Sequence, residues 1–169
     1  MIGYVACPWE SAAMSENADK SNAIVRPPIA WAIAILAGIG VDWLYPLRFV
    51  PGSVPRIWVG GGIFMAALAL AIWAIVTISK AGSRVETYKP TTIIVTNGPF
   101  RFTRNPIYLG MLLGQAGLAV GFDNLWMLAM LVPFYLVLRY GVIAREEPYL
   151  EHKFPLDYLS YKSRVRRWV

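Results

Sequence analysis

The chain has 169 residues, of which 57% are hydrophobic and only 15% are charged. Soluble domains carry about 25% charged residues, so this composition predicts one membrane-embedded domain. The single cysteine, Cys7, excludes an intrachain disulfide, and the single histidine, His152, excludes a histidine-rich metal centre. We expect neither a metal site nor a nucleic-acid partner, and the net charge of +6 has to be interpreted from where the charges lie.

The first 26 residues are polar to mixed in character. They do not follow the order of a signal peptide, in which a basic segment precedes an apolar core and a cleavage site. We expect a solvated tail at residues 1–26, with Met14 as a second candidate for the native start, and a single membrane domain over residues 27–169.

Four apolar segments then predict an all-α, polytopic membrane protein. The segment Ile57–Ser79 carries no charge and is long enough to cross a hydrocarbon core of about 30 Å as a helix. Only Asp123 and Asn124 separate the last two segments, so we expect them to form a tight antiparallel C-terminal hairpin. The other three predicted spans are Pro27–Leu47, Pro106–Phe122 and Leu125–Ala144.

Basic residues gather on one side of these spans. One group lies between the second and third spans, and another follows the fourth: Lys80, Arg84, Lys89, Arg101, Arg104, Arg145, Lys153, Lys162, Arg164, Arg166 and Arg167. The opposite side holds Arg48 and Arg56. Because cytoplasmic loops carry an excess of Lys and Arg, we expect both termini to be cytoplasmic, in a bacterial or archaeal inner membrane.

Glycines recur at helical spacing along the third predicted span, at Gly110, Gly114, Gly117 and Gly121. Small residues at this spacing let helix backbones approach closely in lipid. We interpret them as a packing face, which would also allow a homodimer. Alternatively, Gly110 leaves room for a ligand, and the same two interpretations apply to residues 60–62.

The stretch GPFRFTRNPIYLG, from Gly98 to Gly110, places two arginines just before a predicted helix. Pro106 suits the first helical turn, and Asn105 suits the N-cap position before it. The free N–H groups and the dipole of a helix N-terminus favour an anion. We therefore expect a carboxylate or phosphate of a cofactor here, although anchoring at the membrane surface explains Arg101 equally well.

The fourth span is followed directly by the sequence REEPYLEHKF. Because Pro148 cannot lie deep inside a helix without a kink, we expect a break near Glu146 and Glu147 and a short cytoplasmic helix beginning at Pro148. Leu150 and Phe154 would share one face of that helix. The two carboxylates could then accept hydrogen bonds from an ammonium group or a ribose.

Arg139 lies inside the fourth predicted span, about 9 Å from its cytoplasmic end at about 1.5 Å per residue. An arginine at this depth is a functional candidate by default, with snorkelling to the interface as the alternative. We expect His152 to be solvated. The run of Tyr158, Tyr161 and Arg164 either packs short helices onto the site or forms an aromatic belt.

These two motifs, GPFRFTRNPIYLG and REEPYLEHKFPLDYLSYKSRVRRW, together resemble the isoprenylcysteine carboxyl methyltransferase and phospholipid methyltransferase family of integral membrane enzymes. The resemblance covers residues 98–168. It implies a methyltransferase that uses S-adenosylmethionine and releases S-adenosylhomocysteine. It further implies a cytoplasmic cofactor pocket between the motifs and a lipophilic acceptor that arrives from the membrane.

Carried over residue by residue, the resemblance implies cofactor contacts in both motifs, at Gly98, Pro99, Arg101, Arg104, Asn105, Tyr108, Gly110, Glu146, Glu147, Leu150, Tyr158 and Tyr161. Asn105 stands where the family usually has histidine, and an amide cannot act as an acid or a base. The chain also departs from the family pattern at Phe100, Pro155 and Arg166.

Methyl transfer from a sulfonium requires positioning more than strong acid–base chemistry. We expect Glu146 or Glu147 to bind the cofactor's amino group or ribose, and Arg104 to hold its carboxylate. Arg145 or Arg139 would orient an anionic acceptor. Two alternatives stay open: an NADPH-dependent membrane reductase related to sterol reductases, and a membrane scaffold without enzymatic activity.

Overall fold

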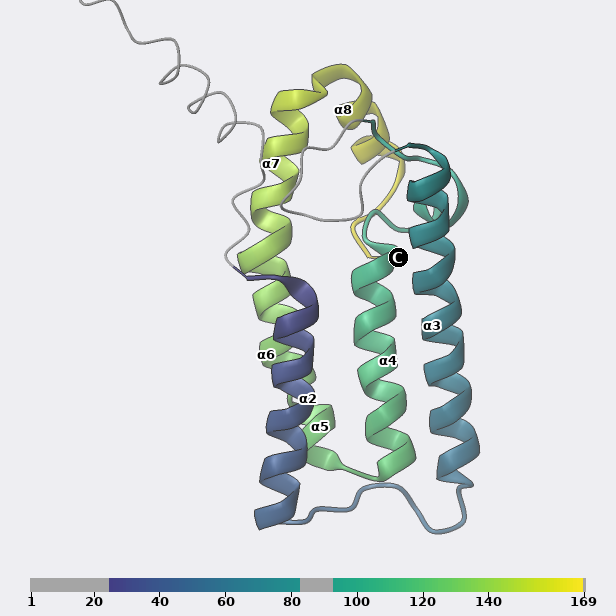
Figure 1. Cartoon of the computed structure of the whole chain (residues 1–169), viewed down its shortest axis with the longest axis vertical. Helices are drawn as coiled ribbons and strands as arrows, with labels where there is room; N and C mark the ends of the chain where they lie inside the picture. The colour runs from purple at the N-terminus through teal and green to yellow at the C-terminus, as the bar shows by residue number, and fades with distance from the viewer. Residues whose placement is uncertain (1–24, 83–92, 169) are drawn as a thin grey trace, which may run out of the picture.

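A computed structural model describes residues 25–82 and 93–168 (Figure 1). In these residues the chain forms helices and no strand, which confirms the all-α prediction. Most of the predicted tail at residues 1–26 lies outside the described residues. The helices before the fourth span are α2 (Pro27–Leu44), α3 (Arg56–Lys80), the 3₁₀ turn η1 (Gly98–Arg101) and α4 (Pro106–Phe122).

A continuous stack of helical pieces then runs from Leu125 to Lys153, beside α2 in Figure 1. Pro133 has no N–H to donate to the carbonyl of Ala129, and the first break in the stack lies next to Ala129. The stack contains a π-helix, a form that is frequent at functional sites. Its pieces are α5 (Leu125–Ala129), α6 (Leu131–Leu136), the π-helix η2 (Val137–Ile143) and α7 (Ala144–Lys153), and α8 (Pro155–Arg164) follows it.

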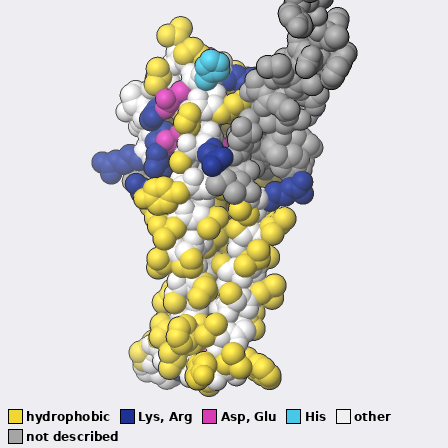
Figure 2. All heavy atoms as spheres, turned by 90° about the vertical axis from the view of Figure 1, so that its left-hand side faces the viewer, with side chains coloured by type: hydrophobic (Ala, Val, Ile, Leu, Met, Phe, Trp, Pro, Cys, Tyr) yellow, Lys and Arg dark blue, Asp and Glu magenta, His cyan; other side chains and the backbone are white. Residues whose placement is uncertain are grey.

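Within the described residues, three helical segments are long and apolar enough to cross a membrane: Pro27–Leu44, Arg56–Lys80 and Leu125–Lys153. The third predicted span, Pro106–Phe122, is a shorter apolar helix of 17 residues, or about 25 Å at 1.5 Å per residue. Hydrophobic side chains cover the lower part of the molecule, and charged side chains gather near the other end (Figure 2). This arrangement agrees with a polytopic membrane protein.

Helices α3 and α4 pack closely through glycines. A Cβ atom on Gly60 would lie 2.5 Å from the carbonyl oxygen of Gly117, and one on Gly117 would lie 2.7 Å from the backbone nitrogen of Phe64. A Cβ on Gly110 would lie 3.0 Å from the carbonyl oxygen of Ala67. The α4 glycines, Gly110 included, therefore form the expected packing face.

The turn between α4 and α5 is tight, as predicted, and Asp123 organises it. Asp123 has a left-handed backbone with φ of 53°, and its carboxylate accepts hydrogen bonds from the backbone nitrogens of Phe49 (2.9 Å) and Val50 (2.8 Å). It also pairs with Arg56 at 3.0 Å. The hydrogen bonds from Val50 and Phe49 lower the pKa of Asp123 from its ordinary value. One carboxylate thus joins the loop before α3 to the α4–α5 turn.

The predicted helix break at Glu146 and Glu147 is wrong. The helix continues through Pro148 and ends at Phe154, whose φ of −133° is non-helical. Phe154 precedes Pro155, and a residue before proline disfavours the helical conformation. Pro155 then opens α8 at the first helical position. In the turn before Pro148, Glu146 and Glu147 both contact residues of the first motif.

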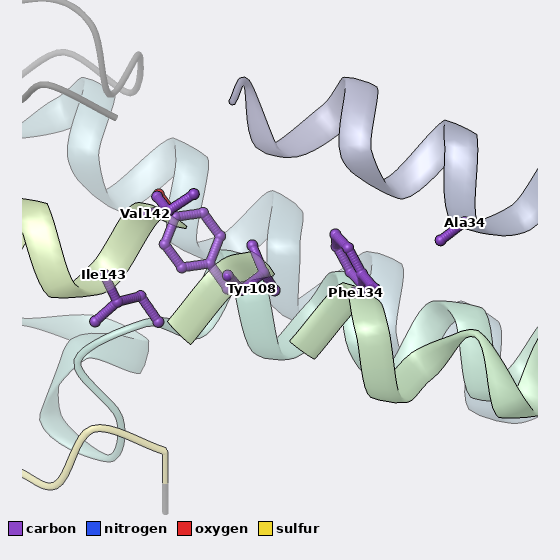
Figure 3. Packing of buried hydrophobic residues seen from close by; sticks show 6 residues of the cluster. Ala34, Tyr108, Phe134, Val142 and Ile143 are labelled. Carbon is purple, nitrogen blue, oxygen red and sulfur yellow. The ribbon is translucent and has the colours of Figure 1, made fainter. Parts of the chain in front are cut away.

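A cluster of buried side chains packs α2 and α4 against the helical stack Leu125–Lys153 near the charged end of the molecule. It contains Ala34, Tyr108, Phe134, Val142 and Ile143, together with Leu138. Figure 3 shows the ring of Tyr108 next to Val142. This cluster fixes the first turn of α4 against η2, and so positions the polar groups of both motifs.

Candidate functional site

The two sequence motifs meet where α4 begins and α7 passes it. The Tyr108 hydroxyl donates a hydrogen bond to Glu146 Oε1 at 2.8 Å, and Arg104 Nη1 lies 3.2 Å from Glu147 Oε1. These pairs bring together residues that are about 40 positions apart in the chain. The predicted proximity of the two motifs is therefore present in the fold.

Glu147 is buried between two arginines. Besides Arg104, it accepts hydrogen bonds from Arg167 Nε at 3.0 Å and from Arg167 Nη2 at 2.6 Å. The Arg104 and Glu147 side chains are each 10% exposed. The hydrogen bond to Glu147 is the main reason that the pKa of Arg167 is raised, and the positive charge of Arg139 opposes this rise. Glu147 thus links the first motif, α7 and the C-terminal segment.

Glu146 has different surroundings although it is the next residue. It is half-buried, and in the described part of the chain its carboxylate is bound by the Tyr108 hydroxyl and by no cation. A carboxylate can accept about four hydrogen bonds. Glu146 therefore keeps acceptor capacity for a further donor, whereas Glu147 is already engaged by two arginines.

The backbone turn of the first motif depends on Gly98. Gly98 has a left-handed φ of +60°, and a Cβ atom there would lie 2.8 Å from Thr77 Oγ1. A glycine at this position lets η1 turn closely over α3. The next residues, Pro99 and Phe100, are buried, and the Phe100 carbonyl accepts a hydrogen bond from the Tyr161 hydroxyl at 2.8 Å.

The α8 tyrosines pack onto the site rather than forming a belt. Tyr158 and Tyr161 are buried, and Arg104 Nη1 donates to the Tyr158 hydroxyl at 3.3 Å. Burial and the nearby Glu147 carboxylate raise the pKa of Tyr158 to about 12, although Arg104 opposes the shift. Both tyrosines therefore remain protonated donors at neutral pH.

Asn105 occupies the N-cap position of α4, but its side chain does not cap the helix. Its amide Nδ2 instead donates to the carbonyl oxygen of Arg167 at 3.1 Å. Thr103 Oγ1 donates to the same carbonyl at 3.1 Å, and the backbone nitrogen of Arg104 donates to the Arg166 carbonyl at 3.0 Å. The part of the capping prediction that concerned the Asn105 side chain is thus wrong, because that side chain anchors the C-terminal segment.

Several other predicted site residues are either exposed or packed against α8. Arg101 and Arg145 are exposed, and so is His152, as expected. Leu150 and Phe154 pack together against the buried tyrosines of α8, which agrees with their predicted shared face. A separate cavity of about 290 Å³ does not include the glutamates, and is lined by Ile93, Ile94, Thr96, Phe154, Asp157, Ser160 and Arg164.

Arg139 projects from the π-helix η2. Its Nη1 donates to the Tyr135 hydroxyl at 3.0 Å, and its guanidinium lies 5.5 Å from the centroid of the Tyr140 ring. Tyr135 in turn contacts Trp168, with ring centroids 5.5 Å apart. The C-terminal segment therefore reaches both the glutamates and Arg139.

Sequence reasoning missed the roles of Thr103, Arg167 and Trp168. Arg167 belongs to the basic run after Arg164, where every arginine fits a topology signal equally well. The hydrogen bonds of Thr103 go to a backbone carbonyl, and no sequence pattern marks such a partner. Only the fold shows that the C-terminal segment returns to the start of α4.

A family model described as phospholipid methyltransferase matches residues 55–156, which is more than half of the chain and includes Arg104, Tyr108 and both glutamates. The chain belongs to the phospholipid methyltransferase family. Membership indicates a membrane methyltransferase, in agreement with the resemblance of the two motifs. The α8 tyrosines and Arg167 lie beyond the matched residues.

Two curated proteins are similar to parts of this chain. An uncharacterized protein of Haemophilus influenzae is 40% identical over 63 residues, which cover 37% of this chain and 100% of that protein. The cobalt-zinc-cadmium resistance protein CzcN of Cupriavidus metallidurans is 28% identical over 123 residues, which cover 73% of this chain. The chain spans about half (49%) of the length of CzcN. No solved structure matches the chain significantly.

Proposed function

We propose that this protein transfers a methyl group from S-adenosylmethionine to a lipophilic acceptor at the cytoplasmic end of its helices. The observation that supports this most is the difference between Glu146 and Glu147. Glu147 is neutralised by Arg104 and Arg167, whereas Glu146 faces only the Tyr108 hydroxyl in the described residues. Glu146 is therefore suited to bind a cation such as the cofactor's ammonium group.

A binding group for the cofactor's carboxylate is present next to this acceptor. Arg104 keeps a buried Nε–H without a hydrogen-bond partner, and an unpaired buried donor costs about 1–3 kcal/mol. Arg104 and Tyr108 are one turn apart at the start of α4, while their partners Glu147 and Glu146 are neighbours. This donor and this acceptor fit the zwitterionic amino-acid end of S-adenosylmethionine.

The cofactor, when bound, supplies an electrophilic methyl group, and the protein has to orient it and exclude water. Glu146 and Arg104 would hold its amino-acid end, and Tyr108 would keep the Glu146 carboxylate in place. Glu147 would act through Arg104 by fixing the guanidinium. Other cofactor contacts are also proposed, at Gly98, Pro99, Arg101, Asn105, Gly110, Leu150, Tyr158 and Tyr161. On the acceptor side, Arg145 or Arg139 would orient an anionic acceptor.

Ligand-induced thermal stabilisation of the purified full chain tests the cofactor class. We expect S-adenosylhomocysteine to raise the melting temperature and NADPH to leave it unchanged. The reverse pattern would favour the membrane reductase, and no response to either would favour the scaffold. Radiolabelled S-adenosylmethionine incubated with membranes, followed by extraction of lipids, peptides and volatile products, would identify the acceptor.

Calorimetry on two matched variants tests the role of Glu146. We expect Glu146→Gln to weaken S-adenosylhomocysteine binding by about tenfold or more, since charge-assisted hydrogen bonds contribute about 1.5–3 kcal/mol. Glu151→Gln is the control because Glu151 lies on the same helix and pairs with Lys162 instead. Equal affinities for Glu146→Gln and Glu151→Gln would remove Glu146 from the cofactor site.

The name of CzcN raises metal resistance as a second role. In the described residues, however, no three His, Cys, Asp or Glu side chains gather into a group that could hold a metal ion.

A further inference from the structure

Aromatic side chains mark two levels along the membrane-spanning helices. On α3, the exposed Trp58 and Trp73 lie 15 residues apart, or about 22 Å at 1.5 Å per residue. On the stack Leu125–Lys153, Trp126 and the exposed Tyr140 lie 14 residues apart, or about 21 Å on the same scale. Tryptophan and tyrosine are enriched at both membrane–water interfaces. These pairs therefore span a hydrocarbon core that is thinner than the usual core of about 30 Å, and a tilt of either helix would make it thinner still.

The same two levels coincide with the ends of α4, which lies beside α3 (Figure 1). A Cβ atom on Gly60 would lie 2.3 Å from the backbone nitrogen of Gly121, so Trp58 lies level with the end of α4. A Cβ atom on Gly98 would lie 3.3 Å from Trp73 Nε1, so Trp73 lies beside the first motif, just before α4 begins. The 17 residues of α4 cover about 25 Å. Helices of different length thus indicate one thin apolar band.

Arg139 lies at the inner edge of this band, next to Tyr140. Its Nη1 donates to the hydroxyl of Tyr135, so the guanidinium is held toward the preceding turn and does not extend toward the polar end of the molecule. The ring of Trp168 lies 5.5 Å from that of Tyr135, so the polar C-terminal segment reaches this depth as well. Local thinning of the bilayer is one way in which an arginine within a membrane-spanning segment is tolerated.

The side chains between the two levels of α3 are suited to contact lipid. Met65 is 61% exposed and Ile72 is 50% exposed, on a helix that is apolar enough to cross a membrane. An apolar surface shorter than the hydrocarbon core is accommodated by thinning of the surrounding bilayer, by snorkelling or by oligomerisation. The hydrogen bond of Arg139 to Tyr135 disfavours snorkelling at this position.

We propose that this protein fits a hydrocarbon core of about 21–25 Å and thins the bilayer around it, so that its preferred lipid partners are phospholipids with short acyl chains. Thinning brings headgroups and water to the level of Arg139 and of the first motif. The inference concerns the lipid-facing surface and does not depend on the proposed methyl transfer.

Reconstitution of the purified full chain into three phosphatidylcholines tests this fit. Dimyristoleoyl, dioleoyl and dierucoyl phosphatidylcholine share one headgroup and differ in chain length. We expect the melting temperature to be highest in the dimyristoleoyl lipid and several degrees lower in the dierucoyl lipid, because mismatch is unfavourable in proportion to its size. A bundle matched to a core of about 30 Å would not be most stable in the shortest lipid.

Quenching of tryptophan fluorescence by brominated dioleoyl phosphatidylcholine gives a measurement that does not require unfolding. We expect dimyristoleoyl phosphatidylcholine to displace the brominated lipid from the exposed tryptophans more effectively than dierucoyl phosphatidylcholine does. Tryptophans protected from the brominated lipid would instead indicate that a second copy of the chain covers this surface, and would contradict the proposal.

Two matched variants test the position of Arg139. Arg139→Leu lengthens the apolar part of the stack, so it should reduce the difference in melting temperature between the short and long lipids. Arg164→Leu removes an exposed arginine of α8, which follows the membrane-spanning segment, and should keep the full difference. A melting temperature that is highest in the dioleoyl or dierucoyl lipid, or an unchanged difference in Arg139→Leu, would overturn the proposal.

Discussion

Glu147 has the surroundings of a structural residue, and its removal has a clear expected effect. In Glu147→Gln, Arg104 and Arg167 would lose the carboxylate between them while staying largely buried. Breaking a buried ion pair by removing one partner costs about 3–5 kcal/mol. We expect a large fall in the melting temperature of the detergent-purified protein, measured by thermal unfolding.

Glu146→Gln and Glu151→Gln serve as the comparisons for this prediction. Glu146 makes one hydrogen bond, to the Tyr108 hydroxyl, which a glutamine oxygen can still accept. Glu151 lies nearer the surface and pairs with Lys162, so its replacement should change stability by no more than about 1 kcal/mol. A fall for Glu147→Gln no larger than that of Glu151→Gln would contradict the structural role of Glu147.

The lowered pKa of Asp123 predicts how the stability of the folded protein depends on pH. Its pKa is lowered in the folded protein by hydrogen bonds from Val50 and Phe49, so the unfolded chain binds its proton more readily. Stability contributed by Asp123 is therefore present above its ordinary pKa of 3.8 and is lost as the pH falls through the lower folded value.

Thermal unfolding across this acidic range measures the effect. We expect the melting temperature of the wild type to fall below about pH 4, and Asp123→Asn to have a lower melting temperature at neutral pH with a weaker decline on acidification. Asp157→Asn, at an exposed position of α8, should keep the wild-type profile. If Asp123→Asn declined as steeply as the wild type, the acid sensitivity would come from other groups.

At the scale of elements, residues 60–62 of α3 include a glycine that contacts α4 and glycines that do not. A Cβ on Gly60 would lie 2.3 Å from the backbone nitrogen of Gly121, whereas Gly61 has nothing within 4 Å. We expect Gly60→Leu to force α3 and α4 apart and to lower the melting temperature strongly, since overpacking costs about 1–3 kcal/mol or more. Gly61→Leu should have little effect, or a slightly favourable one through helix propensity.

Glycine patterns in the sequence predicted close packing, but they could not say which glycines contact the neighbouring helix. That depends on the rotation of each helix, which the fold settles. Unfolding of the two leucine variants side by side checks the assignment. Similar stability of Gly60→Leu and Gly61→Leu would mean that α3 presents another face to α4.

The helix break illustrates what local rules leave undecided. Both Pro148 and Pro155 disfavour a continuous helix, but only Phe154 and Pro155 end one. In the turn before Pro148, Glu146 and Glu147 contact distant residues of the first motif, and tertiary context routinely overrides local propensity. The same limit hid the roles of Asn105, whose partner is 62 residues away in the chain, and of Arg167, whose side chain binds Glu147 20 residues before it.

Across the whole molecule, polar chemistry is concentrated at one end of the helices. The ion pairs of Glu147 in α7 and the tyrosines of α8 lie toward this end, whereas Asp123 and its arginines lie at the α4–α5 turn, at the opposite end (Figure 1). Helices α2, α3 and α4 alternate in direction, and the stack from α5 to α7 continues the alternation (Figure 1). The N-terminal end of α2 and the C-terminal segment therefore lie on the same side of the bundle's apolar part.

The distribution of basic residues predicts the orientation of this bundle in the membrane. Arg48 lies in the loop between α2 and α3, Arg56 is the first residue of α3, and the other side holds most of the basic residues. We therefore expect the polar end to be cytoplasmic. Fusions of a reporter that is active only in the cytoplasm, placed after Val169 or after Gly52, measure it in bacterial cells. We expect activity for the first fusion and none for the second.

A charge-shift variant makes this test sharper. Arg48 and Arg56 also bind Asp42 and Asp123, so topology is better perturbed by adding lysines beside the exposed Gly52 than by removing these arginines. A few added lysines should weaken the orientation bias and should reduce reporter activity at Val169 in parallel. Activity of the Gly52 fusion in the unmodified chain would instead place the glutamates on the outer side, away from cytoplasmic S-adenosylmethionine, and would rule out the proposed reaction there.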